Sequence, residues 1–113
     1  MRKQESTNTE NFDSINKSCD AAYALSIISG RWKLCIIGKL SIGPARYSEL
    51  RDALKTVSDR VLASQLKQME IDGLIIRKIF AEIPVRVEYQ LTEKANALNQ
   101  ILRDLSGWGS TYK

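Results

Sequence analysis

The sequence predicts a single small domain that is mainly α-helical and carries one β-hairpin. Apolar residues recur with helical spacing through residues 19–72 and again after Thr92. Between these parts the period changes to two, over residues 74–91, with Pro84 in the middle. The 113-residue chain is 43% apolar and 27% charged, which is enough for one hydrophobic core and typical of a soluble globular protein.

Residues 1–17 are predicted to form a flexible N-terminal tail. Phe12 and Ile15 are the only large apolar side chains after Met1, too few to order the segment by burial. Its three basic and three acidic residues cancel, whereas residues 31–94 hold twelve basic against eight acidic residues. The net charge of +4 therefore lies in the predicted domain, residues 18–113, which fits an anionic partner without requiring one.

Two helices are predicted before the strong turn signal Gly43-Pro44. The first covers residues 19–29 and ends at Gly30; the second covers residues 31–42. In the second helix an i, i+3, i+4, i+7, i+8 set is mostly apolar, which predicts that these residues are buried: Trp32, Cys35, Ile36, Lys39 and Leu40. Cys35 is accordingly predicted to be an inert core thiol.

A third helix, residues 46–54, is predicted from the inward-facing set Tyr47, Leu50 and Leu54. After a three-residue link, a fourth helix covers residues 58–72, with Ser58 as its N-cap and Gly73 at its end. Val57 and Leu62 can form a hydrophobic staple at its start. Two short helices joined by a tight turn form a helix-turn-helix, although the glycine often found in that turn is absent.

The fourth helix has an apolar face and a polar face. Leu62, Leu66 and Met69 form the apolar stripe. The other face carries hydrogen-bonding groups around one small residue: Asp59, Arg60, Ala63, Ser64, Lys67 and Gln68. A helix that enters the major groove of DNA needs such a face. The alternative is an ordinary solvated helix surface.

A hairpin follows, with strands at residues 74–80 and 86–91 and a loop at 81–85. The first strand has apolar groups on both faces, and the second alternates strictly, as a half-buried strand does. Thr92 then caps one last helix, whose apolar stripe contains Ala95, Leu98, Ile101, Leu102, Leu105 and Trp108. Helices, hairpin and helix in this order form a winged helix-turn-helix.

Several ordered motifs make the chain similar to the HxlR-type regulators, relatives of the MarR group. They are Ile28-Ser-Gly-Arg-Trp-Lys-Leu, Gly43-Pro-Ala-Arg-Tyr-Ser-Glu-Leu, Ser58-Asp-Arg-Val-Leu-Ala-Ser-Gln-Leu-Lys-Gln-Met-Glu, Asp72-Gly-Leu-Ile and Pro84-Val-Arg-Val-Glu-Tyr-Gln-Leu-Thr-Glu. The resemblance covers residues 19–108. It departs from the family pattern at Ala22, near a usual Pro-Val pair, and at Ala95, at a usual glycine-like position.

The resemblance implies a sequence-specific DNA-binding transcriptional regulator that acts as a homodimer. The recognition helix, residues 58–72, would enter the major groove, and the wing, residues 81–86, would meet the backbone or minor groove. The predicted DNA-binding residues are Arg46, Ser58, Asp59, Arg60, Ala63, Ser64, Lys67 and Arg86. Asp59 can instead orient Arg60, and Arg86 can instead pair with a carboxylate such as Glu82.

The terminal helices are predicted to dimerise, because their apolar residues exceed what one small domain needs. The predicted dimer interface comprises Tyr23, Leu25, Leu98, Ile101, Leu102, Leu105 and Trp108. A two-fold dimer presents two recognition helices about one turn of DNA apart, so the operator should be an inverted repeat of double-stranded DNA.

Cys19 begins the first predicted helix, where a helix N-terminus favours thiol reactivity and Asp20 opposes it. It resembles a cysteine that some members of the family use to sense oxidants or electrophiles. The alternative is a partly buried structural thiol. A small molecule is a second possible kind of signal.

Other functional classes find little support in the sequence. The chain has no histidine, its two cysteines match no metal-binding spacing, and it has no phosphate-binding glycine loop. We therefore expect no enzyme, no catalytic residues, no metal and no cofactor.

No signal-peptide core or apolar run of about 20 residues is present, so we expect a cytoplasmic protein without membrane contact. The competing hypothesis is a winged-helix protein-interaction module without sequence-specific DNA binding.

Overall fold

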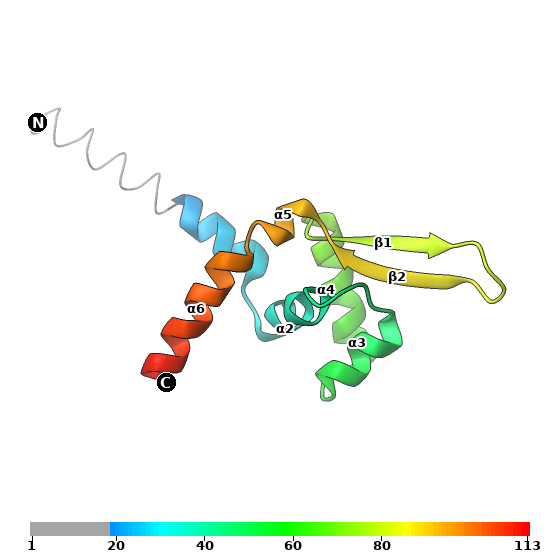
Figure 1. Cartoon of the computed structure of the whole chain (residues 1–113), viewed down its shortest axis with the longest axis horizontal. Helices are drawn as coiled ribbons and strands as arrows, with labels where there is room; N and C mark the ends of the chain where they lie inside the picture. The colour runs from blue at the N-terminus through cyan, green and yellow to red at the C-terminus, as the bar shows by residue number, and fades with distance from the viewer. Residues whose placement is uncertain (1–18) are drawn as a thin grey trace, which may run out of the picture.

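The computed structural model describes residues 19–113, so the predicted flexible tail at residues 1–17 lies outside the described residues. A helix at residues 19–28 is followed by α2 (Arg31–Leu40), α3 (Tyr47–Leu54) and α4 (Asp59–Ile71). Then come the antiparallel strands β1 (Ile75–Phe80) and β2 (Arg86–Leu91), and last the helices α5 (Glu93–Asn96) and α6 (Asn99–Tyr112). This order is the predicted winged helix-turn-helix, with the hairpin as its wing (Figure 1).

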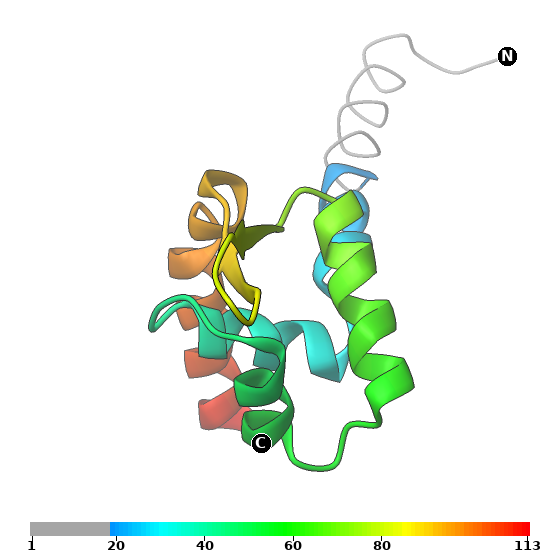
Figure 2. The same ribbon diagram turned by 90° about the vertical axis from the view of Figure 1, so that its right-hand side faces the viewer.

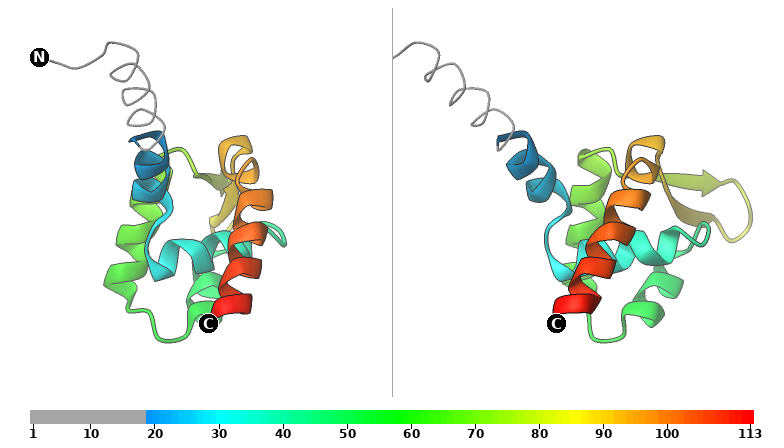
Figure 3. Two further views of the ribbon diagram at one scale, coloured as in Figure 1. Left: turned by 90° about the vertical axis from the view of Figure 1, so that its left-hand side faces the viewer. Right: turned by 60° about the vertical axis from the view of Figure 1, so that its left-hand side comes forward.

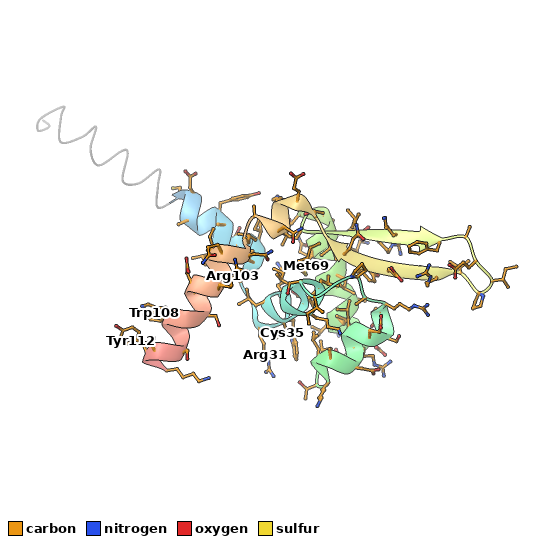
Figure 4. The ribbon with its side chains drawn as sticks, viewed as in Figure 1. Arg31, Cys35, Met69, Arg103, Trp108 and Tyr112 are labelled. Atoms are coloured by element: carbon orange, nitrogen blue, oxygen red, sulfur yellow. The ribbon has the colours of Figure 1, made fainter. Side chains whose placement is uncertain are left out.

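The hydrophobic core lies where α2, α3, α4 and the base of the hairpin meet, with Met69 of α4 near its centre (Figure 4). Its largest fully buried side chains are Ile36, Ile37, Leu50, Leu62, Leu66, Met69, Leu74 and Ile75. All of the predicted inward-facing residues of α4 belong to this set, so the polar face of α4 is left on the surface.

The predicted burial of α2 is confirmed for Ile36 and Leu40 but is wrong for Cys35. The buried residues are Lys33, Ile36, Ile37 and Leu40, so the buried face is rotated slightly from the predicted one, and Trp32 and Lys39 are half-buried. Ile37 joins the core beside Ile36, and this rotation turns Cys35 outward. Cys35 is therefore an exposed thiol in the single chain rather than a core residue.

The start of α4 agrees closely with the sequence prediction. The Ser58 hydroxyl accepts a hydrogen bond from the Val61 N–H at 3.1 Å, and Val57 and Leu62 are both buried. At its end Gly73 adopts a φ of +77°, a conformation that favours glycine. Cap, staple and glycine together fix the ends of α4 against the core.

The wing projects away from the helices, and this explains where its predicted burial pattern fails. Phe80 pairs with Arg86 across the predicted five-residue loop. Of β1 only Ile75, next to the core, is buried, and all six residues of β2 are half-buried instead of alternating. Tyr89 and Leu91 pack against the core, but residues nearer the loop extend beyond it (Figure 1).

Two main-chain hydrogen bonds join the wing to the helix-turn-helix. The Ala45 N–H donates to the Tyr89 carbonyl at 3.0 Å, and the Tyr89 N–H donates to the Ala45 carbonyl at 2.8 Å. Ala45 comes two residues before α3, so the bridge fixes the start of α3 relative to β2. The sequence pattern did not predict this contact, because a single bridged residue has no periodicity.

The last predicted helix is divided into two. Thr92 caps α5 as predicted, accepting a hydrogen bond from the Ala95 N–H at 3.2 Å. The Leu98 N–H then bonds to the Ala95 carbonyl, three residues back, instead of the residue four back. This tighter turn separates α5, whose Ala95 is buried in the core, from α6.

Candidate nucleic-acid interface

The exposed face of α4 holds the central group of predicted DNA-binding residues. Arg60, Ala63, Ser64 and Lys67 have i, i+3, i+4, i+7 spacing and are all exposed, opposite the buried stripe. Within the described residues, Arg60 and Lys67 make no hydrogen bond or ion pair, so both cations are available to a partner. Ala63 lies between them and leaves room for a close approach.

The wing and α4 are both visible when the molecule is viewed from the side toward which the wing projects (Figure 2). Together they offer a surface on which one helix is flanked by a hairpin, as in the winged proteins that bind a DNA groove. Arg46, just before α3, is exposed and directly follows Ala45, which is bridged to the wing. Its backbone N–H donates to the Glu49 carboxylate at 2.7 Å, which caps the start of α3.

Arg86 pairs with carboxylates, which is the alternative to DNA contact that the sequence left open. Its guanidinium donates to Glu82 at 2.9 Å and to Glu88, and it lies over the Phe80 ring at 3.9 Å. The hydrogen bond to Glu82, together with the charges of Glu82 and Glu88, raises the pKa of Arg86 above its ordinary value. The wing therefore presents a guanidinium whose charge is largely balanced by two carboxylates.

Asp59 is engaged by α3 and not by Arg60. Its Oδ1 accepts hydrogen bonds from the Tyr47 hydroxyl at 3.0 Å and pairs with Arg51 Nε at 3.2 Å. The Tyr47 hydroxyl also lies 3.1 Å from the Asp59 carbonyl oxygen. The sequence pattern assigned Arg51 no role and placed Tyr47 only as an inward-facing residue, because the face of α3 alone does not show what its polar groups reach.

Burial and the hydrogen bond to Asp59 raise the pKa of Tyr47 above its ordinary value of 10.0. The phenol is therefore protonated at neutral pH and can donate to Asp59. Because the phenol is a donor to a carboxylate, this contact is charge-assisted, which makes it stronger than a contact between neutral groups.

The predicted dimer residues lie on the opposite side of the molecule from the wing. The helix at residues 19–28 and α6 appear together in the view from that side (Figure 3). None of the 14 residues of α6, all of them within the described part of the chain, is buried. Leu98 and Leu102 pack partly against the core, whereas the remaining predicted residues are exposed: Tyr23, Leu25, Ile101, Leu105 and Trp108.

A third aromatic residue, Tyr112, extends this surface beyond the prediction. Tyr112 stacks near Trp108 with ring centroids 5.2 Å apart, and both project away from the rest of the chain (Figure 4). A groove of about 590 Å³ separates α2 from α6. Its lining includes Leu34, Ile37 and Gly38 of α2 and Leu102, Arg103 and Leu105 of α6.

Both cysteines are free and exposed in the described chain. Cys19 is the first described residue, so its predicted place at the start of a helix depends on residues outside the described part. Among residues 19–113 no group of three or more potential metal-ligating side chains comes together. No helix in the same range is long and apolar enough to cross a membrane.

Comparison with known proteins gives consistent matches over most of the chain. A family model described as HxlR-like helix-turn-helix matches residues 27–113. The HTH-type transcriptional regulator BH0655 of Halalkalibacterium halodurans is 46% identical over 88 residues, covering 77% of this chain and 78% of the relative.

Solved structures are similar over nearly the same range. One is described as a transcriptional regulator of the MarR family from Enterococcus faecalis V583; it is 44% identical, with a TM-score of 0.79, and the match covers 85% of this chain and 87% of that one. The redox regulator HypR in its oxidized form is 30% identical, with a TM-score of 0.78, over 84% of this chain and 98% of its own.

Proposed function

The chain belongs to the HxlR-like helix-turn-helix family of transcriptional regulators, and from that premise we propose that it binds an inverted-repeat operator as a homodimer. Because its partner is chromosomal DNA, it would act in the cytoplasm. The proposal assigns no catalytic step, metal or cofactor to the chain.

In this proposal α4 enters the major groove with Arg60 and Lys67 on either side of Ala63. The observation that carries it is the exposed polar face of a helix whose other face is fixed in the core. Arg60 would read a base edge, and Ser58 and Ser64 would contact bases or phosphates near it. Arg46 and Lys67 would hold phosphates, and Arg86 would meet the backbone only as far as Glu82 and Glu88 release it.

The terminal helices would form the two-fold interface. A 14-residue helix without a buried side chain gains little stability from its own chain, so α6 needs another surface to cover its apolar stripe. A second copy supplies the same stripe, as a two-fold interface requires.

A signal would reach this dimer by one of two routes. One is oxidation or alkylation of Cys19, which lies on the same helix as Tyr23 and Leu25; the similarity to the redox regulator HypR supports this route. The other is a small molecule bound in the groove between α2 and α6.

The test measures binding to the DNA upstream of the chain's own gene at several salt concentrations. We expect tight, salt-steep binding, because phosphate contacts release counterions. Arg60→Ala should lose at least about five-fold in affinity for the preferred site and relax its sequence preference, whereas Lys67→Ala should weaken all sequences alike.

Arg31→Ala at the start of α2, an exposed arginine outside the proposed DNA-binding, dimer and groove residues, is the matched control and should bind like the wild type. Absence of binding both to this DNA and to a random-sequence pool, by a folded dimer, would instead support the interaction-module hypothesis.

A further inference from the structure

The contacts of Asp59 lie at the point where the two helices of the helix-turn-helix meet. Asp59 is the first residue of α4, directly after its cap Ser58. Tyr47 and Arg51 lie one helical turn apart on α3 and both reach the same oxygen, Asp59 Oδ1, at 3.0 Å and 3.2 Å. Two donors from one helix therefore hold one acceptor at the start of the next.

We propose that Tyr47, Arg51 and Asp59 form an interhelical clamp that sets the angle of α4 against α3, and that Asp59 is a positioning residue for DNA recognition and does not read a base. This inference rests on the proposed function and adds Tyr47 and Arg51 to the residues on which operator specificity depends. The clamp acts through Arg60 and Lys67, which it does not touch.

The geometry of α4 makes specificity sensitive to such a clamp. Arg60 directly follows Asp59 and lies nine residues before the fully buried Met69, or about 14 Å along the helix. A tilt of about 5° about that buried end, once the clamp is lost, would therefore move Arg60 by about 1 Å. Hydrogen bonds to base edges weaken over such a shift, whereas long cations can still follow nearby phosphates. Loss of the clamp should therefore reduce specific binding more than non-specific binding.

The carboxylate is also poorly placed to read a base while the clamp is formed. Its Oδ1 is shared by two donors, and reading a cytosine amine would require Asp59 to turn away from α3. Asp59 and Arg51 are both more than half exposed, so their ion pair contributes little to folding by itself. Its effect should consequently appear in recognition and not in folding stability.

The experiment uses operator DNA selected from a random pool with the wild-type protein, and compares its affinity with that of scrambled DNA at the same salt concentration. Tyr47→Phe removes the hydroxyl and keeps the ring. We expect the ratio of specific to non-specific affinity to fall about three- to ten-fold, while the protein remains fully folded at the temperature of the binding assay. Arg51→Gln, at an exposed position, should lower the ratio in the same direction.

Asp59→Ala should lower the ratio further, although loss of a negative charge raises affinity for all sequences alike. The double variant Tyr47→Phe with Asp59→Ala should be no worse than Asp59→Ala, because both changes break one network. Asp59→Asn keeps an oxygen that can accept from Tyr47 and should recover part of the ratio.

Two results would overturn the clamp. One is an unchanged ratio in Tyr47→Phe and Arg51→Gln. The other is an Asp59→Ala variant with a changed base preference at one symmetric pair of operator positions, which would make Asp59 a base reader. Failure of the proposed function itself would appear earlier, as a wild-type protein that selects no site from the pool, and the clamp hypothesis would fall with it.

Discussion

Lys55 carries backbone strain in the turn between α3 and α4. It adopts a φ of 56° and a ψ of −65°, and the Thr56 N–H bonds to the Leu54 carbonyl at 2.6 Å across it. This is close to the strained form of the γ-turn, which an L side chain rarely adopts. The missing turn glycine noted in the sequence would belong at this position.

We expect Lys55→Gly to raise the free energy of unfolding by about 1 kcal/mol, because glycine relieves the strain and loses only part of this gain to its freer unfolded chain. Urea unfolding measures the change. Lys55→Ala removes the exposed side chain but keeps Cβ, and it should show no such gain. Equal effects of the two substitutions would mean that the turn is not strained.

A paired comparison of variants can also show which of the two thiols responds to oxidants. Because Cys35 is exposed, contrary to the prediction from its helical position, both cysteines are open to reagents. We expect diamide in the presence of a small thiol, which it couples to Cys19 as a mixed disulfide while it takes up two electrons and two protons, to release wild-type protein from its operator. Cys19→Ser should stay bound, and Cys35→Ser should behave like the wild type. The reverse pattern would assign sensing to Cys35. Retention of DNA by the oxidised wild type would exclude thiol control.

At the scale of elements, local sequence signals predicted the helices and strands well. Ser58, Gly73 and Thr92 mark element ends through contacts with near neighbours in the chain, and the structure confirms all three positions. The errors lie where contacts between residues far apart in the chain determine the end of a helix or the burial of a side chain. Packing against the core sets where α5 ends and α6 begins. It also sets the rotation of α2, which exposes Cys35.

In the candidate site too, local features could be predicted from the sequence and long-range contacts could not. The exposed set on α4 could be predicted, because a helical period alone separates Arg60 and Lys67 from the buried stripe. The engagement of Asp59 by Tyr47 could not, since the two residues are 12 positions apart and belong to different helices. For Arg86 the carboxylate alternative was foreseen: Glu88 lies two residues along the same strand, and the conformation of the loop brings Glu82 to it.

The wing offers a test of how the ion pairs of Arg86 with Glu82 and Glu88 affect DNA binding. Glu82→Gln removes one of the carboxylates that hold Arg86 and one negative charge from the wing. We expect several-fold tighter binding to all DNA sequences and a steeper salt dependence, as a released cation meets phosphate. Electrophoretic mobility shifts at three salt concentrations measure both.

A double variant, Glu82→Gln with Arg86→Ala, controls for the simple loss of negative charge. It should lose most of the added salt dependence. If it binds like Glu82→Gln, the wing guanidinium makes no phosphate contact and the ion pairs with Glu82 and Glu88 are its main role.

At the scale of the whole molecule, the wing lies at one end and the terminal helices lie at the other, with α4 between them (Figure 1). A second copy that packs on the terminal helices would therefore leave the wing uncovered. In the proposed dimer, the spacing of the two recognition helices would depend on how α6 packs against its partner.

We expect Trp108→Asp to convert the dimer to a monomer that keeps its fold. Trp108 is 65% exposed in the single chain, so the change costs little within one copy, whereas an unpaired carboxylate in an apolar interface is strongly unfavourable. Sedimentation velocity measures the mass, and circular dichroism the fold.

Ile42→Asp is the matched control, because Ile42 is 84% exposed at the end of α2, outside the predicted interface, and this variant should remain dimeric. The monomer should still bind one half-site weakly and lose the dependence of affinity on half-site spacing. A Trp108→Asp protein that remains dimeric would place the interface elsewhere.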